Sequence, residues 1–420
     1  MSLLTCIIII IVIILVWKIS SIYYSLNIYD RYDYFDYAAT TPPYDRSMTL
    51  GYFGAYQGNL SQFYNRENRL QVERINGYIM ANVVSAPLFF NLLCNSGASE
   101  SNNTILKTFS KMGRVIIGNT EHHTSMACVE DSANWPNNKP NYLLYDFRSL
   151  DRLYESITPD TKLISIMHVN NEIGYIYPIM EIYRIIETYR KNNNTEFPYL
   201  HSDMSQSFAK MENPCPEIDI ISASAHKFYG PLGCGIIIHK KNIKLQTMIY
   251  GTQQNGTRGG TTNYPAILAT ADSFCSTVSD MPNEIKKITQ FRDEISVALI
   301  QNFPAVNMFD LKSNPINNYS PIIGFYPNSS PYILSFSILT GKGRFNNIKF
   351  KDRMLGKDII IGTGSACSMG SSTVLNNLKL PEEANQGFIR ISFGRLTTKK
   401  AVNRLKKQLI SEIQNWFNTE

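Results

Sequence analysis

The sequence predicts an α/β fold built on a largely parallel sheet. Apolar stretches of strand length end near residues 122, 171, 203 and 226, and helix-length intervals separate them. Polar side chains stand at these ends, namely His122, Asn171, Asp203 and the pair His226 and Lys227. Because parallel strands open their carboxyl ends on one crevice, we expect these side chains to converge there.

Composition sets limits on the function. A chain of 420 residues with 44% hydrophobic and 18% charged residues is long enough for one large and one small domain. The net charge of +6 is mild and no basic run with interleaved aromatic residues occurs, so we expect no nucleic-acid partner. The seven cysteines are odd in number and lack CxxC spacing, which argues against a disulfide framework and a zinc site. They favour a reducing compartment.

The N-terminal segment is strongly apolar. Residues 1–17 carry no charged side chain, and residues 3–17 are mostly isoleucine, valine and leucine. This run is shorter than the roughly 20 residues of a typical membrane span, and it lacks the basic start of a secretory signal. Lys18 follows at once, and Tyr23 and Tyr24 suit a membrane interface. We expect residues 1–20 to form a membrane anchor with the rest of the chain in the cytoplasm; a buried N-terminal strand or helix is the alternative.

One lysine, Lys227, stands in an unusual setting. It follows a mostly apolar run that begins at residue 218, and a Gly-Pro turn comes after it. Burial lowers a lysine pKa, and a neutral amine can bond to an aldehyde cofactor, whereas the alternative is a strand-end lysine that extends to water. Ser224 and His226 supply donors for a phosphate, and glycines at positions 230, 233 and 235 permit sharp turns. This combination indicates pyridoxal phosphate (PLP).

The stretch from Ser224 to Gly235 resembles the lysine motif of the NifS-like cysteine desulfurases, a branch of the class V aminotransferase family. That motif reads Ser-x-His-Lys followed by Tyr-Gly-Pro-x-Gly-x-Gly, and further family blocks occur in the same order over residues 34–398. The resemblance implies PLP fold-type I, with a mostly parallel, seven-stranded type of sheet in a large domain and a smaller α+β C-terminal domain. We place the PLP-binding domain at residues 34–282 and the small domain at residues 283–420.

Two blocks precede the phosphate turn, and they match the family unequally. Residues 34–43 resemble the signature near the substrate site, although a strand that ends in a proline turn would give the same pattern. The family's Gly-Asn-Pro-Ser-Ser-x-His stands here as Gly58 and Asn59 followed by Leu60 and Ser61, and its histidine is missing. The departure concerns the substrate entrance rather than the cofactor.

Residues 94–103 resemble the family's phosphate-binding turn. Glycine and small residues open a helix that we expect to run to about residue 112, and free N–H groups at a helix start bind phosphate. Capping alone would explain Ser99. With Lys227 in place, we assign Ala98 and Ser99 to the PLP phosphate.

Later blocks supply the contacts that the resemblance implies for the PLP ring. His122 ends a strand over residues 115–123 and would stack on the ring and pass protons, although a lone histidine is more often structural. Residues 167–174 nearly copy a family block whose two asparagines could bond the phenolic oxygen or merely close a turn, and the resemblance assigns Asn171 to that oxygen. After a helix to about residue 191 and a strand over 199–202, Asp203 matches the partner of the ring nitrogen and Gln206 a partner of the ring oxygen. We expect residues 132–145 to form a loop.

Residues 258–261 resemble an Arg-x-Gly-Thr block whose threonine reaches the phosphate bound by the other subunit. The resemblance therefore assigns Thr261 to the cofactor and implies a homodimer with shared active sites. Residues 251–254 match the family only approximately. Apolar residues at helical spacing over residues 283–303 predict the helix that leads into the small domain.

The small domain carries a second reactive group. Residues 361–372 are a run of small residues suited to a mobile loop, with Cys367 inside it. Most free cysteines are inert core residues, but Gly-Ser-Ala-Cys is the family's nucleophile motif. Residues 386–398 resemble the block that makes Arg390 the holder of the substrate carboxylate. An amphipathic helix is expected over residues 399–417.

The resemblance implies a PLP-dependent cysteine desulfurase that converts L-cysteine to L-alanine. Lys227 would take the α proton, and Cys367 would attack the substrate sulfur and carry it as a persulfide. An acceptor protein, such as an iron–sulfur scaffold or a tRNA-thiolating enzyme, would receive the sulfur. The alternatives are another class V enzyme, such as a selenocysteine lyase or an aminotransferase, and a PLP-binding scaffold without catalysis. No metal site is expected.

Overall fold

The computed structural model describes residues 28–45, 48, 66–131, 141–303, 307–308, 322–324, 329–339, 345–364, 372–379 and 382–419. Three features of the sequence lie outside these residues: the apolar segment 3–17, the departure that follows Gly58, and the loop that carries Cys367. Among the helices of the described ranges, none is long and apolar enough to cross a membrane.

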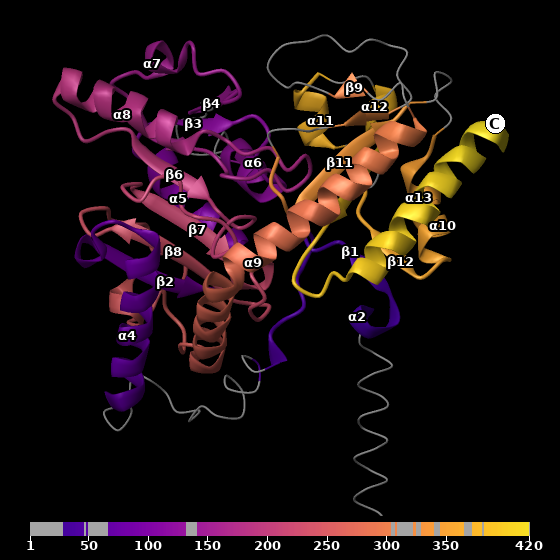
Figure 1. Ribbon diagram of the computed structural model, residues 1–420. Helices are drawn as coiled ribbons and strands as arrows, with labels where there is room; N and C mark the ends of the chain where they lie inside the picture. The colour runs from indigo at the N-terminus through magenta and orange to yellow at the C-terminus, as the bar shows by residue number, and fades with distance from the viewer. Residues whose placement is uncertain are drawn as a thin grey trace, which may run out of the picture.

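A seven-stranded sheet forms the centre of the larger part of the molecule (Figure 1). Its strand order is β2-β8-β7-β6-β5-β3-β4, and the five strands from β7 to β4 are mutually parallel. β8 runs antiparallel to both of its neighbours. The strands are β2 (Phe90–Asn95), β3 (Arg114–Gly118), β4 (Tyr142–Tyr145), β5 (Thr161–Ser165), β6 (Tyr199–Asp203), β7 (Ile220–Ser224) and β8 (Gly235–Lys240). The predicted α/β class with a mostly parallel sheet is confirmed.

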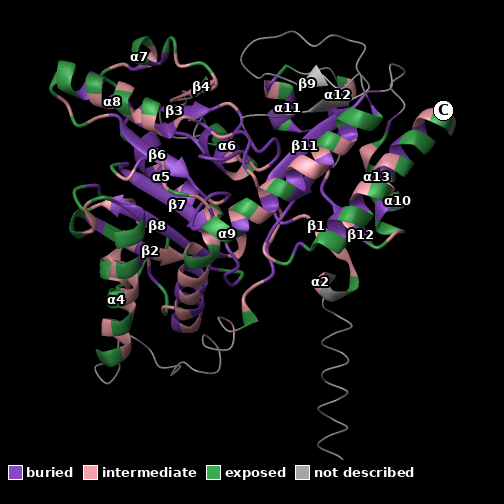
Figure 2. Ribbon diagram, viewed as in Figure 1, coloured by how far each residue is buried: buried purple, intermediate pink, exposed green. Residues whose placement is uncertain are grey.

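Helices cover both faces of this sheet, because successive side chains of a strand point to opposite sides. In β3, Ile116 belongs to one core, and Val115 and Ile117 belong to the other. The first core includes side chains of α4 (Arg66–Val83) and α8 (Ile179–Asn193), and the second includes those of α5 (Ala98–Ser110) and α6 (His123–Asp131). Figure 2 shows the strands buried between helices that expose one side. A short helix, α7 (Leu153–Ser156), precedes β5.

The prediction of a loop over residues 132–145 is wrong at its end. There β4 (Tyr142–Tyr145) pairs in parallel with β3 at the edge of the sheet. Its sequence, Tyr-Leu-Leu-Tyr, consists of aromatic and apolar residues that suit a half-buried strand. The asparagines and prolines that precede it obscured this signal.

The helix predicted over residues 283–303 is the second half of α9 (Tyr264–Asn302), which is 39 residues long. Asn263 caps its start, because the side chain accepts a hydrogen bond of 3.2 Å from the N–H of Ala266. Pro282 lies inside the helix. A proline removes one helical hydrogen bond and bends the axis without necessarily ending the helix. The two halves of α9 run in different directions in Figure 1.

A third core lies around the second half of α9. It holds Ile288 and Ile295 of that helix and the buried faces of α10 (Asn347–Leu355) and α13 (Lys399–Thr419), the latter as predicted. Two small sheets border it, with strand orders β13-β11-β10-β9 and β1-β12. Their strands are β1 (Asp33–Phe35), β9 (Asn307–Met308), β10 (Ile322–Gly324), β11 (Ile333–Ile338), β12 (Ile359–Ile361) and β13 (Phe388–Ser392), and α2 (Ile28–Arg31), α11 (Thr373–Asn377) and α12 (Glu382–Gln386) complete this part.

The N-terminal strand ties the two parts together. β1 pairs in parallel with β12, which brings Phe35 into the third core. The chain then passes Ala38 and Thr41 to the seven-stranded sheet, where the N–H of Thr41 donates to the carbonyl of His226 at 3.0 Å. The division of the chain at residue 283 stays a prediction.

Candidate active site

A cavity of about 380 Å³ opens at the carboxyl ends of β3, β5, β6 and β7. Its walls bring together most of the residues that the sequence singled out: Ala98, Ser99, His122, Asn171, Asp203, Gln206, Ser224, His226, Lys227 and Arg390. Thr261 is exposed and does not line the cavity, and Cys367 lies outside the described residues. The convergence that the strand ends predicted is therefore present, and the volume is that of a small-molecule site.

The amine of Lys227 lies inside this cavity. Lys227 ends a single helical turn, Ala225–Lys227, that follows β7 directly. Its Nζ donates hydrogen bonds to the carbonyls of Ala38 at 2.7 Å and Ala39 at 2.6 Å. Burial, together with the positive charges of Arg390 and Lys210, lowers the pKa of Lys227 to about 7. A lysine of this pKa is neutral in a large fraction of molecules at neutral pH, so it can act as a nucleophile and as a proton acceptor.

The start of α5 forms another wall. The first N–H groups of a helix have no partner within it and attract anions. Gly235 allows β8 to approach this turn, because a Cβ atom there would lie 2.5 Å from backbone atoms of Gly97. His226 is placed beside the lysine, and its Nδ1 lies 3.0 Å from the hydroxyl of Thr40. Burial and then Lys227 lower the pKa of His226 to about 4, so it is neutral at physiological pH.

Asp203 provides a carboxylate opposite these groups. Its Oδ1 accepts a hydrogen bond from the N–H of Ser205 at 2.9 Å, and its Oδ2 accepts one from Nδ2 of Asn102 at 2.7 Å. Gln206, one turn later, donates from Nε2 to the carbonyl of Ala38 at 3.0 Å. His122 bonds to the hydroxyl of Thr124 at 2.9 Å, and burial lowers its pKa.

Arg390 extends from β13 to the cavity and carries a buried positive charge. Its Nη2 pairs with Asp36 at 2.7 Å, and its Nη1 donates to the carbonyl of Asn171 at 2.7 Å. Its Nε is buried and has no hydrogen-bond partner among the described residues. The guanidinium lines the cavity and places a positive charge where a carboxylate substrate would need one.

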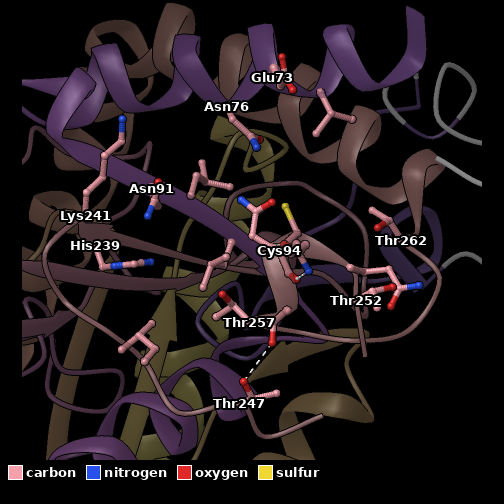
Figure 3. A pocket seen from close by; sticks show the side chains of 18 of the residues that line it. Glu73, Asn76, Asn91, Cys94, His239, Lys241, Thr247, Thr252, Thr257 and Thr262 are labelled. Carbon is pink, nitrogen blue, oxygen red and sulfur yellow. Dashed lines mark hydrogen bonds between the residues drawn. The ribbon is translucent and has the colours of Figure 1, made fainter. Parts of the chain in front are cut away.

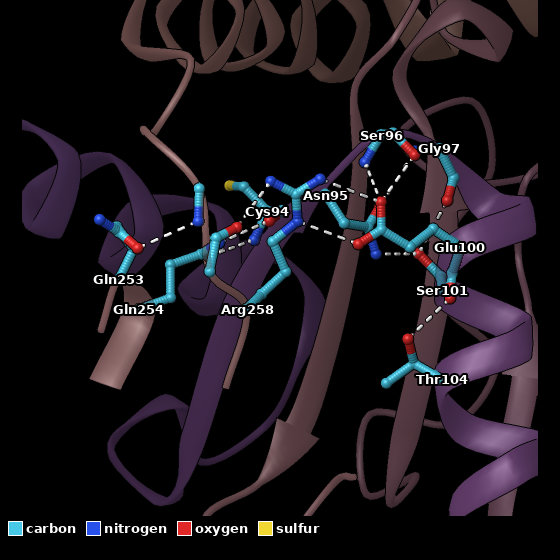
Figure 4. Close-up of polar contacts among 12 residues, drawn as sticks. Cys94, Asn95, Ser96, Gly97, Glu100, Ser101, Thr104, Gln253, Gln254 and Arg258 are labelled. Atoms are coloured by element: carbon cyan, nitrogen blue, oxygen red, sulfur yellow. Dashed lines mark hydrogen bonds and ion pairs between the residues drawn. The ribbon is translucent and has the colours of Figure 1, made fainter. Parts of the chain in front are cut away.

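The segment that contains Thr261 is anchored to the start of α5 (Figure 4). The side-chain amide of Gln254 bonds to both the N–H and the carbonyl of Cys94, each at 2.7 Å. Arg258 pairs with Glu100 at 3.0 Å, and Glu100 also accepts from the N–H and hydroxyl of Ser96. Burial opposes ionisation of Glu100, but the hydrogen bonds from Arg258 and Ser96 lower its pKa overall. These contacts fix the segment and leave Thr261 exposed beyond it.

A larger cavity of about 670 Å³ lies between α4 and the strands β2 and β8 (Figure 3). Its walls include Asn76, Asn91, His239 and Thr252, and none of the site residues predicted from the sequence lines it. The smaller cavity, with its buried amine, is therefore the candidate active site.

Sequence reasoning missed several residues that shape this cavity. Ala38 and Ala39 hold the lysine through their carbonyls, which any residue type could do. Asn102 belongs to the block of residues 94–103, but the sequence assigned no role to it. A signal was present, because asparagine is unfavourable inside a helix and here stands on the buried face of α5.

The residues present fit PLP. An aldehyde requires an amine, a pyridine nitrogen requires an acid partner, and a phosphate requires backbone donors. The cavity offers these as Lys227, Asp203 and the start of α5. The buried hydroxyl of Ser205, in the same wall, also has no hydrogen-bond partner among the described residues, which leaves it available to a ligand.

Comparison with known proteins agrees with this geometry. The chain matches the family described as Aminotransferase class-V over residues 33–405. A cysteine desulfurase IscS of Dictyoglomus turgidum is 30% identical over 390 residues, covering 88% of this chain and 91% of that protein. A human cysteine desulfurase is 28% identical over 405 residues, covering 91% and 81%. A solved structure of a NifS-like protein is 26% identical with a TM-score of 0.75 and covers 91% of this chain and 99% of that one.

Proposed function

This chain belongs to the class-V aminotransferase family, and we propose that it is a PLP-dependent cysteine desulfurase, which converts L-cysteine to L-alanine. One observation carries the proposal: a single cavity joins the buried amine of Lys227, the carboxylate of Asp203 and the start of α5. The similarity to cysteine desulfurases extends over most of both chains.

PLP, when bound, withdraws electrons from the α-carbon of an amino acid. We assign its ring nitrogen to Asp203, its ring face to His122 and its ring oxygen to Asn171 and Gln206. We assign its phosphate to four residues of the same cavity: Ala98, Ser99, Ser224 and His226.

Lys227 and Arg390 act on the substrate in this proposal. Arg390 binds the carboxylate of cysteine through its positive charge, because its side chain lines the cavity. Lys227, whose pKa is near 7, accepts the proton of the α-carbon at its Nζ and returns it later in the reaction. The carbonyls of Ala38 and Ala39 hold Nζ on the cavity wall.

Cys367 is the proposed sulfur acceptor within the enzyme. Its thiolate attacks the sulfur of cysteine, so the bond between that sulfur and the β-carbon breaks, an S–S bond forms, and the β-carbon takes a proton to give alanine. Burial raises the pKa of each of the five cysteines in the described ranges, Cys94, Cys128, Cys215, Cys234 and Cys275, which makes these thiols poor nucleophiles. The nucleophile motif at Cys367 is the support for its role.

Three further parts of the proposal concern partners. A homodimer would let the exposed Thr261 reach the phosphate in the other subunit. An acceptor protein would take the persulfide sulfur from Cys367. Residues 3–17 would anchor the enzyme to a membrane from the cytoplasmic side; deletion of residues 1–20 should then release it from membranes and preserve PLP binding.

Purified protein supplied with PLP, L-cysteine and a thiol reductant tests the function. We expect alanine and sulfide in equal amounts, with both lost in Lys227→Ala. A wild-type preparation that binds PLP but forms neither product would contradict the proposal.

A further inference from the structure

A line of buried polar side chains runs behind Asp203, away from the cavity. It consists of Ser165 on β5, His201 on β6, Ser222 on β7 and Asn102 on α5. These four side chains are at most 1% exposed, and of the four only Asn102 lines the cavity. Such groups are costly to bury unless their hydrogen bonds are satisfied, so their pairing is informative.

The members of this line are joined by hydrogen bonds of ordinary length. Ser165 Oγ lies 2.9 Å from His201 Nδ1, and His201 Nε2 lies 2.9 Å from Ser222 Oγ. Ser222 Oγ lies 2.6 Å from Asn102 Oδ1, and Asn102 Nδ2 lies 2.7 Å from Asp203 Oδ2. The same Nδ2 also donates to Ser125 Oγ at 3.1 Å.

The chemistry of the groups gives this line a single direction. Asp203 accepts a hydrogen bond at both oxygens, so the amide of Asn102 must turn its NH₂ group to Asp203 and its oxygen to Ser222. An amide oxygen only accepts, so Ser222 donates to it and must itself accept from His201. His201 therefore carries a proton on Nε2.

The other nitrogen of His201 completes the direction. Burial lowers the pKa of His201 to about 4, although the charge of Asp203 opposes this, so the ring is neutral and Nδ1 accepts from Ser165. Every donor in the line then points toward Asp203. The opposite orientation of Asn102 would place its oxygen against the carboxylate, where two acceptors repel.

We propose that Asn102, oriented by Ser222 and His201, is a positioning residue that holds Asp203 as a charged acceptor for the ring nitrogen of PLP. This inference rests on the proposed function, because PLP is the group that Asp203 would bind. Ser222 and His201 act through Asn102 and do not line the cavity.

Two buried serines provide a matched test. Ser222→Ala and Ser125→Ala each remove one hydroxyl that bonds to Asn102. The hydroxyl of Ser222 donates to the amide oxygen and so sets the orientation of the amide. The hydroxyl of Ser125 only accepts from the NH₂ group, which also donates to Asp203. The first measurement is the dissociation constant of PLP, obtained by equilibrium dialysis against cofactor-free full-length protein. The second is the midpoint of thermal unfolding of each variant. We expect Ser222→Ala to weaken PLP binding roughly tenfold. Ser125→Ala should leave the affinity within about twofold of wild type.

Asn102→Asp provides the second arm. It preserves the shape of the side chain but places a carboxylate 2.7 Å from Asp203, where two carboxylates share one proton. We expect PLP to bind roughly tenfold to a hundredfold more weakly and the visible absorbance of the bound cofactor to shift. If Asn102→Asp does not fold, the serine pair decides the question.

The outcomes separate the two claims. Wild-type affinity in both Asn102→Asp and Ser222→Ala would overturn the positioning role and leave the proposed function intact. Equal losses of affinity in Ser222→Ala and Ser125→Ala would also overturn it, because orientation of the amide would then not matter. A wild-type protein that does not bind PLP would contradict the proposed function and this inference together.

Discussion

At the scale of the residue, burial decides which groups of the candidate site are neutral. Lys227 and His226 lie next to each other, and burial is the largest cause of the lowered pKa of both. Lys210, which is 2% exposed, adds positive charge nearby, and burial lowers its own pKa to about 8. Near neutral pH His226 is therefore neutral and Lys227 is neutral in a large fraction of molecules, which favours an amine able to react.

The lowered pKa of Lys227 predicts a pH-dependent stability. In the unfolded chain the lysine holds its proton up to its ordinary value of 10.5, whereas in the folded chain it releases it near pH 7. Between these values the unfolded state binds more protons, so the free energy of unfolding of the cofactor-free protein rises with pH. Lys227→Met should be more stable than wild type near pH 7, by on the order of a few kcal/mol.

Urea unfolding of both proteins at several pH values measures this difference, which should shrink as the pH rises toward about 10. Lys210 is present in both proteins, so its own titration largely cancels. A difference that stays constant over this range would show that the amine is not neutralised by burial.

At the scale of the element, the site depends on β8 passing very close to the start of α5. Gly235 is the first residue of β8, and a Cβ atom there would lie 2.4 Å from Oδ1 of Asn95 as well as close to Gly97. Contacts this short force the backbone to shift. The glycine is therefore required by the approach of two elements.

Gly235→Ala should destabilise the protein by about 1–3 kcal/mol and weaken PLP binding, because the phosphate turn must move. Gly77→Ala in α4 is the control, since nothing lies within 4 Å of its added Cβ. That change should stabilise the protein by about 0.5–1 kcal/mol. Urea unfolding and PLP titration measure both effects; equal stability of the two variants would contradict the close approach.

Local pattern predicted the elements that carry the site and failed where the pattern changed. Strand ends at His122, Asp203 and Lys227 were identified because apolar runs stop there, and the cavity joins them. The first half of α9, which precedes Pro282, was not predicted, because the helical spacing was recognised only over residues 283–303. Asn102 was missed because its importance comes from partners on three other elements, which no local pattern contains. Cys367 and Thr261 stay predictions.

At the scale of the whole molecule, the site joins the two parts of the structure. Arg390 lies on β13 in a small sheet beside the third core, yet its ion pair with Asp36 and its bond to Asn171 bring it to the cavity at the edge of the seven-stranded sheet. The proposed homodimer would add a third contribution. Thr261 is exposed on a segment that Gln254 and Arg258 fasten, so it is presented outward in a fixed position.

Subunit mixing tests the dimer. Lys227→Ala and Thr261→Ala homodimers should each be impaired, but a mixed dimer contains one site with both an intact Lys227 and an intact Thr261. We expect mixing after reversible dissociation to restore part of the alanine-forming activity. Activity that stays at the average of the two separate proteins would contradict a shared site.

The most direct test of sulfur transfer is the reaction of Cys367→Ser with L-cysteine. A hydroxyl cannot replace a thiolate in attack on sulfur, so this variant should bind PLP with wild-type affinity but form almost no alanine and almost no sulfide. Cys275→Ser is the control, because burial raises the pKa of the Cys275 thiol and makes it a poor nucleophile. This variant should retain most of the turnover. Intact-mass measurement of wild type after brief exposure to cysteine should show one added sulfur atom that Cys367→Ser lacks. Alanine and sulfide formed by Cys367→Ser at the wild-type rate would contradict the account.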